Sequence, residues 1–198
     1  MDEIVKQAIA KWPNVPHCYG WLALDARGNW RMRDERAQAL NLPGDRITNA
    51  ALLGFINRNY MHDEPGQWYF QNGPQRVYVN LEATPYVART DPAHGFVLHT
   101  GEPMQDIEGA WMTETGRMLL KGAKKIAIVD DRDMAQCIAM LCMRGRLAED
   151  QQLLDWLEDG QDSDTLTFRH GGKQFPMQRI TLDAMEEYFG FVREPRPV

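Results

Sequence analysis

The chain has 198 residues, 43% hydrophobic and 25% charged, which is an ordinary globular composition and argues against disorder. A formal net charge of −6 argues against a general nucleic-acid binder, because neutralising phosphates requires a clustered positive field. No apolar run approaches the roughly 18 residues that span a bilayer, and the N-terminus lacks the pattern of a signal peptide. The three cysteines, Cys18, Cys137 and Cys142, have no CxxC spacing. We therefore expect a soluble cytoplasmic protein with reduced thiols, one that binds neither nucleic acid nor membrane.

Apolar periodicity and turn residues predict the elements of the first half. In chain order they are a helix over residues 2–11, a hairpin over 21–32, a loop over 33–47, a helix over 48–60 and a hairpin over 66–81.

The hairpin over residues 66–81 is the best-defined of these elements. Trp68 and Phe70 alternate with polar or tyrosine positions, and so do Val77 and Val79 after a Gly/Pro cluster. Cross-strand partners share a face, so only a loop with an even number of residues places the aromatic rings opposite the valines. We predict a four-residue loop, Asn72 to Gln75, which pairs Phe70 with Val77 and Trp68 with Val79.

The second half repeats the same kinds of pattern. Its predicted elements are a short strand over 96–98, a hairpin over 110–120, a strand over 124–129, a helix from Asp130 or Asp131 to about Arg144, a helix over 150–158, a hairpin over 165–180 and a helix over 181–189.

The order hairpin, helix, hairpin occurs twice along the chain. Gly28 matches Gly116, and residues 70–75 match 168–173. We predict an α+β fold of two hairpin–helix–hairpin repeats, with antiparallel sheets packed against helices. The boundary is placed near Pro103, giving subdomains 1–103 and 104–198 within one globular unit. Glycine-containing hairpins also recur by chance, and that alternative stays open.

Two segments carry a resemblance to known families. KWPNVPHCYGWLALDARGNWRMRD (residues 11–34) and WYFQNGPQRVYVNLEATPYV (residues 68–87) resemble a proteobacterial domain-of-unknown-function family numbered near twenty-nine forty-six. The resemblance covers roughly the first half. The layout is similar to that of the domain-of-unknown-function family twelve eighty-five, for which a signalling role has been suggested. The resemblance implies a duplicated α+β fold, and it implies no reaction and no catalytic residues.

The tip of the hairpin over 66–81 is the candidate binding site. Gln71, Asn72, Gln75 and Arg76 offer amides and a guanidinium that could hold a carboxylate, a phosphate or a partner's backbone. The alternative is turn chemistry, with Arg76 covering the tyrosines of the hairpin.

Two further groups could bind a metal. His62 and Asp63 precede the hairpin, and His94 and His99 follow it; they could converge on one ion if the loops fold together. Asp130 and Asp131 follow a predicted strand and could hold magnesium, or cap the next helix. For the histidines and Asp63, the alternative is a solvated polar connection.

These features favour a non-enzymatic binding or regulatory module that engages a small ligand or a protein. No phosphate loop, G-x-G-x-x-G, G-x-S-x-G or HExxH motif occurs, and no cofactor is expected. One alternative is a small metal-dependent hydrolase. The other is a structural component of a homo-oligomer, in which an uncovered strand pairs with its copy in a homodimer.

Overall fold

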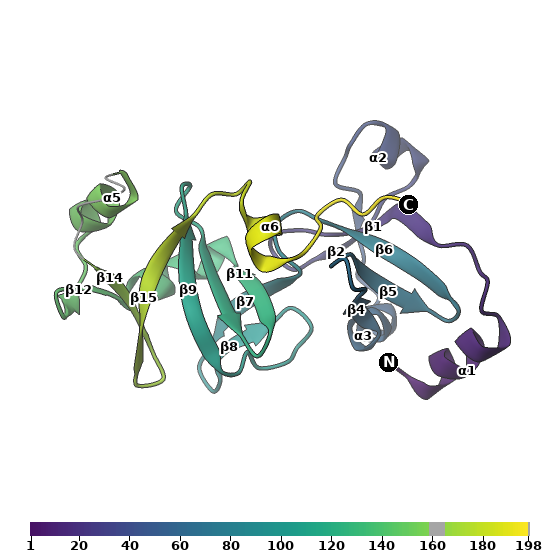
Figure 1. Cartoon of the computed structure of the whole chain (residues 1–198), viewed down its shortest axis with the longest axis horizontal. Helices are drawn as coiled ribbons and strands as arrows, with labels where there is room; N and C mark the ends of the chain where they lie inside the picture. The colour runs from purple at the N-terminus through teal and green to yellow at the C-terminus, as the bar shows by residue number, and fades with distance from the viewer. Residues whose placement is uncertain (159–164, 198) are drawn as a thin grey trace. The chain divides into compact units, whose positions relative to one another are not determined.

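A computed structural model describes residues 1–158 and 165–197 (Figure 1). Contacts divide the chain into two compact units, Met1–Pro85 with Glu186–Val198, and Tyr86–Met185. Each unit combines one β-sheet with helices, so the predicted α+β class is confirmed. Pro103 lies inside the second unit, and the division into domains 1–103 and 104–198 stays a prediction. Among the described residues, no helix has the length and apolarity needed to cross a membrane.

The first unit contains a six-stranded sheet in the order β3-β2-β1-β6-β5-β4 (Figure 1). Its elements are α1 (Glu3–Lys11), β1 (Cys18–Leu24), β2 (Trp30–Met32), α2 (Glu35–Ala39), β3 (Asp45–Arg46), α3 (Ala50–Arg58), β4 (Tyr60–His62), β5 (Trp68–Asn72) and β6 (Gln75–Leu81). Helix α6 (Met185–Phe189) starts at the end of the second unit and leads the chain back into the first.

Strands β5 and β6 form the predicted hairpin in the predicted register. Phe70 pairs with Val77, and Asn72 pairs with Gln75. The loop is therefore two residues shorter than expected, with only Gly73 and Pro74 between the paired ends. Gly73 has a φ of +57°, the sign that the first central position of a type II′ turn requires. In this placement Pro74 does not have to donate the amide that closes the turn.

Helix α3 covers one face of the first sheet. Asn49 begins the helix, and its side-chain oxygen accepts from the amide of Leu52 at 2.9 Å. On the buried side, Ile56 is 1% exposed, and the ring of Phe55 meets Phe70 edge-on at a centroid distance of 5.3 Å. Burying such apolar side chains stabilises by about 1.5–3 kcal/mol each. This face is therefore the hydrophobic core of the unit.

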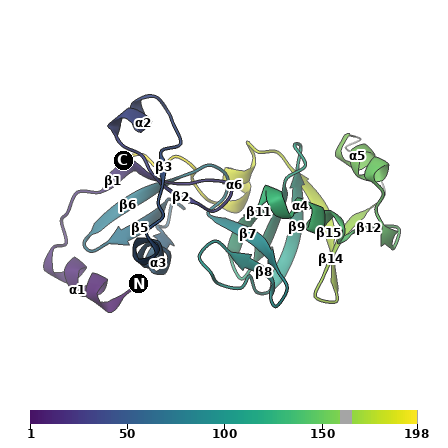
Figure 2. The same cartoon turned by 180° about the vertical axis from the view of Figure 1, so that it is seen from behind.

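The second unit contains a nine-stranded sheet in the order β13-β12-β14-β15-β9-β10-β11-β7-β8 (Figure 2). Its elements are β7 (Tyr86–Asp91), β8 (Gly95–Leu98), β9 (Ile107–Thr113), β10 (Met118–Gly122), β11 (Lys125–Val129), a 3-10 turn (Asp131–Asp133), α4 (Met134–Ile138), β12 (Leu141–Met143), β13 (Arg146–Leu147), α5 (Asp150–Glu158), β14 (Leu166–His170) and β15 (Lys173–Ile180).

The expectation of antiparallel sheets is wrong, because both sheets are mixed. Strands β1 and β6, β7 and β11, and β9 and β15 pair in parallel. The members of each pair come from different hairpins, and the long connections between them permit a parallel crossover.

Two shorter segments also differ from the expectation. Residues 33–47 contain α2 and β3 rather than only loop. The helix predicted to reach Arg144 ends at Ile138, and a small hairpin, β12–β13, follows. Arg144 and Gly145 both have positive φ angles, 50° and 80°, as the central residues of a type I′ turn do.

The strand pairings of the two units match in register. Leu24 pairs with Trp30 and with Leu81 in the first unit, and Met112 pairs with Met118 and with Arg179 in the second. The second hairpins agree as well, since Phe70–Val77 has its counterpart in Phe168–Phe175. One shift of 88 residues relates the first hairpins, and a shift of 98 relates the second hairpins.

Candidate functional site: a charged cavity in the first unit

A cavity of about 630 Å³ opens on the first unit. Its wall is formed by the ends of β1 and β6, the residues after β2, and the C-terminal segment. The charged side chains that line it include Asp25, Arg31, Arg33, Glu82, Glu186 and Arg193. The volume lies within the range of about 300–1,000 Å³ that is usual for small-molecule sites.

The cavity lies on the sheet face opposite the core. Ala23 pairs with Arg31 on one side and with Asn80 on the other, so these three residues share a face. Their neighbours in the chain, such as Leu24 at 1% exposure and Trp30 at 2%, point into the core. The alternation along β1 and β2 therefore places Arg31 on the face that the cavity occupies.

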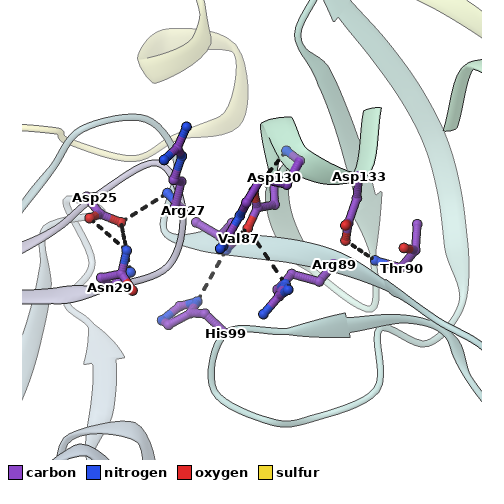
Figure 3. Close-up of polar contacts among 10 residues, drawn as sticks. Asp25, Arg27, Asn29, Val87, Arg89, Thr90, His99, Asp130 and Asp133 are labelled. Carbon is purple, nitrogen blue, oxygen red and sulfur yellow. Dashed lines mark hydrogen bonds and ion pairs between the residues drawn. The ribbon is translucent and has the colours of Figure 1, made fainter. Parts of the chain in front are cut away.

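Asp25 is the most extensively hydrogen-bonded carboxylate of the cavity. It accepts from the amides of Arg27 at 3.0 Å and Asn29 at 2.8 Å and from the Asn29 side chain (Figure 3). It also accepts from Nε of Arg31 at 2.8 Å. Burial by itself raises the pKa of Asp25, but the hydrogen bonds from Asn29, Arg31 and Arg27 together outweigh burial and lower it. Asp25 is therefore a fixed anion that closes the β1–β2 turn and holds Arg31.

Arg33 is a buried cation that has no carboxylate partner among the described residues. It is 7% exposed. Its Nε donates to the carbonyl of Leu42 at 3.1 Å, and its Nη2 donates to Oδ1 of Asn41 at 3.1 Å. These oxygens satisfy donors but carry no formal charge. The other arginines that line the cavity each have an ion pair: Arg31 with Asp25, Arg193 with Glu186, and Arg196 with Glu194.

The C-terminal segment completes the wall beside β6. The amide of Leu81 donates to the carbonyl of Arg193 at 2.8 Å, and Nε of Arg193 contacts Glu186 at 2.9 Å. Gly66 permits this approach, since a Cβ there would lie 2.3 Å from the carbonyl oxygen of Gly190. The amide of Val192 then donates to the Gly66 carbonyl at 3.0 Å.

The predicted binding tip makes contacts within the hairpin and to a neighbouring loop. Gln71 is 3% exposed and donates to the carbonyl of Gly73 at 2.9 Å. Gln75 donates to the carbonyl of Pro16 at 3.0 Å. The guanidinium of Arg76 lies over the ring of Tyr69 at 4.6 Å, while Asn72 is exposed. The turn-chemistry alternative describes these contacts, and binding at the tip stays a prediction.

His62 and Asp63 lie in the first unit, before β5. Nδ1 of His62 contacts the carbonyl oxygen of Asp63 at 2.8 Å. The Asp63 carboxylate accepts from the amide of Gln67 at 2.8 Å and from the hydroxyl of Tyr78 at 3.0 Å. Asp63 thus closes the turn that leads into β5.

His94, His99, Asp130 and Asp131 lie in the second unit. His94 contacts Asp91 at 2.9 Å, and Nδ1 of His99 accepts from the amide of Val87 at 3.2 Å (Figure 3). Asp130 is fully buried, accepts from the amide of Arg132 at 3.1 Å and caps the 3-10 turn that begins at Asp131.

Arg132 and Arg89 also contact the Asp130 carboxylate, at 2.5 and 3.7 Å. Within residues 1–158 and 165–197, no three His, Cys, Asp or Glu side chains form a group suited to a metal ion. The metal site stays a prediction.

Sequence reasoning missed the cavity, although part of its signal was present. Arg31 and Arg33 alternate with Trp30 and Met32, a pattern that favours one face, but the predicted hairpin ended at Met32 and left Arg33 in the predicted loop over 33–47. Asp25 lies within the predicted hairpin over residues 21–32, but no function was predicted for its carboxylate. The contribution of residues 186–196 could not be inferred, because they are more than 100 residues away in the chain.

The fold and the cavity together define a two-unit α+β protein with a charged pocket on its first sheet. Residues 1–196 match the family DUF2944, described as "Protein of unknown function (DUF2946)", and the chain belongs to this family. The resemblance predicted from the sequence is confirmed, and the match extends over both halves.

A solved structure of a DUF1285 family protein from Silicibacter pomeroyi DSS-3 is similar, with a TM-score of 0.51 and 13% identity. The similarity covers 90% of this chain and 96% of that one, and it shows a shared fold. Among curated proteins, none matches the sequence significantly.

Proposed function

We propose that the protein is a binding or regulatory module that takes a small polar ligand into the cavity of the first unit. The observation that carries this proposal is the placement of Arg33, a nearly buried cation without a carboxylate partner, on the wall of an open volume. An isolated buried charge is costly, so a protein usually pairs it or places it where a ligand completes its surroundings.

The same proposal includes an internal duplication in which the two units have diverged. The constant shifts between paired strands support a common ancestor, as do matching turn bonds. Gly28 donates to the carbonyl of Asp25 at 3.0 Å, and Gly116 donates to that of Thr113 at 2.9 Å. At the positions of Asp25 and Arg31 the second unit has Thr113 and Leu119, and Leu119 is fully buried. The Asp25–Arg31 ion pair thus has no counterpart at the matching positions of the second unit.

Native mass spectrometry of the purified full chain tests the proposal. We expect a bound small molecule that Ala23→Phe displaces, because Ala23 lines the cavity and a ring there would occupy its volume. Ala51→Phe is the matched control, since Ala51 is exposed on α3, which packs against the opposite face of the sheet. Retention of the same molecule by both variants would refute binding in this cavity.

A further inference from the structure

The structure assigns an anion subsite to Arg33, from which we infer that the ligand of the cavity carries a carboxylate or a phosphate group. This inference rests on the proposed binding function and adds the chemical class of the ligand. It depends on how the charges around the cavity are paired, on what orients the guanidinium, and on the comparison with the second unit.

The ion pairs leave two side chains of the wall without an opposite charge. Asp25, Glu186 and Glu194 each contact an arginine, at 2.8, 2.9 and 3.4 Å. Arg33 and Glu82 have no ion pair among the described residues. Glu82 is exposed and accepts from the amide of Ala26 at 3.0 Å, so water screens its charge. Arg33 is 7% exposed and largely lacks such screening, so its charge dominates the interaction with a ligand.

The guanidinium of Arg33 is oriented before any ligand arrives. Nε and Nη2 are held by Leu42 and Asn41, and a longer bond joins Nη2 to the carbonyl of Ala37 at 3.5 Å. Nη1 has no hydrogen bond within the described part of the chain and retains its donors. A planar donor group fixed in this way suits an oxyanion, since arginine binds carboxylates and phosphates through charge-assisted hydrogen bonds.

The second unit has the same strand pairing but no buried arginine at the position that corresponds to Arg33. Arg33 continues the β1–β2 ladder through its amide, which donates to the carbonyl of Trp21 at 2.8 Å. The corresponding residue in the second unit is Lys121, paired with Gly109, and its side chain is exposed. A cation at this position can therefore stay in water. Its burial in the first unit is not imposed by the strand pairing, which favours a role in binding.

Amide-detected NMR on the full chain tests the inference, with inorganic phosphate and succinate as anionic probes at constant ionic strength. Ribose serves as a neutral probe and putrescine as a cationic one. We expect phosphate or succinate to shift the amide resonances of residues 23–25, 41–42 and 80–82, together with the Nε–H resonance of Arg33. The more effective of the two anions distinguishes a phosphate-bearing from a carboxylate-bearing ligand.

Two variants locate the effect. Arg33→Gln should weaken the effective anion by about 10-fold or more, because it removes charge-assisted hydrogen bonds. Arg46→Gln is the matched control, because this substitution removes the same charge from an exposed side chain on β3. It should leave the affinity within about 2-fold of wild type. Should Arg33→Gln fail to fold, the wild-type titration decides: a saturable shift of the Arg33 Nε–H resonance supports the inference, and its absence overturns it.

The remaining outcomes separate this inference from the proposed function. Shifts at the cavity with ribose or putrescine alone would overturn the anion subsite while leaving a binding cavity in place. If Arg33→Gln and Arg46→Gln weaken anion binding equally, the effect reflects only the net charge of the protein. That result would also overturn the anion subsite at Arg33. No shift at the cavity with any probe would overturn the subsite, whereas the mass-spectrometry comparison of Ala23→Phe tests binding independently.

Discussion

Replacing Asp25 with asparagine should destabilise the first unit by about 2–4 kcal/mol. The amide oxygen can still accept from the backbone amides of Arg27 and Asn29. The amide nitrogen then faces two donors, Nε of Arg31 at 2.8 Å and Nδ2 of Asn29 at 3.0 Å. Losing hydrogen bonds to a charged group costs about 1.5–3 kcal/mol each, and water at the partly exposed Arg31 side chain recovers some of this.

Urea denaturation followed by tryptophan fluorescence measures this change. The matched control is Asp45→Asn, on exposed strand β3, which should stay within about 0.5 kcal/mol of wild type. Because the folded state lowers the pKa of Asp25 from its ordinary value of 3.8, the stabilisation is complete above that value. It is lost as the pH falls through the lowered pKa. A difference under about 0.5 kcal/mol at pH 7, or one unchanged at pH 3, would refute the reasoning.

Three further substitution or labelling experiments test the fold. Ile56→Ala should cost about 2–5 kcal/mol in urea denaturation, whereas Leu52→Ala on the same helix should cost under about 1 kcal/mol, since Ile56 is 1% and Leu52 37% exposed. Gly73→Ala should lower stability by about 1–2 kcal/mol, because φ is +57° there; no loss would contradict the turn assignment. Burial, with a smaller contribution from Asp133, raises the pKa of the Cys137 thiol to about 12, so a disulfide reagent at pH 8 should label Cys18 first, and mass spectrometry of peptides would show the reverse order if this is wrong.

Local signals in the sequence predicted the hairpins but not how they assemble. The register of Phe70 with Val77 follows from alternation and an even loop, both encoded within a dozen residues. The parallel pairing of Leu24 with Leu81 joins residues far apart in the chain, and nothing in either strand specifies its partner. Sequence patterns therefore predicted the class and most elements, while the mixed sheets required the structure.

Residues 134–143 show a second limit of sequence reasoning. Their apolar residues fit a buried helix as well as a buried strand, because a short apolar run has no decisive period. Leu141 and Cys142 are almost fully buried in β12, paired with β14 on one side and β13 on the other. The tertiary partners thus decided the conformation, against a good local helix propensity.

The limits on predicting the cavity are of the same kind. The predicted hairpin included Arg31 but not Arg33, and whether an arginine has an ion pair depends on which residues the rest of the chain places beside it. Asp25 reaches Arg31 from the adjacent turn, whereas Arg33, among the described residues, donates to uncharged oxygens of Ala37, Asn41 and Leu42. Charge pairing is thus a tertiary property, even where the strand pattern is local.

Asp25 in the first unit corresponds to Thr113 in the second, so a substitution at this position tests how the two units differ in function. If the two halves descend from one ancestor, the turn that Asp25 and Thr113 both close is the inherited part. The Thr113 hydroxyl accepts from the amide of Arg117, just before β10, at 3.0 Å, as Asp25 accepts from the amide of Asn29. The carboxylate is the part that differs between the units, and in the first unit it holds Arg31 at the cavity. Asp25→Thr should accordingly keep the turn, lose the Arg31 pair and weaken any ligand of the cavity. A variant with unchanged binding would mean that Asp25 serves the turn alone.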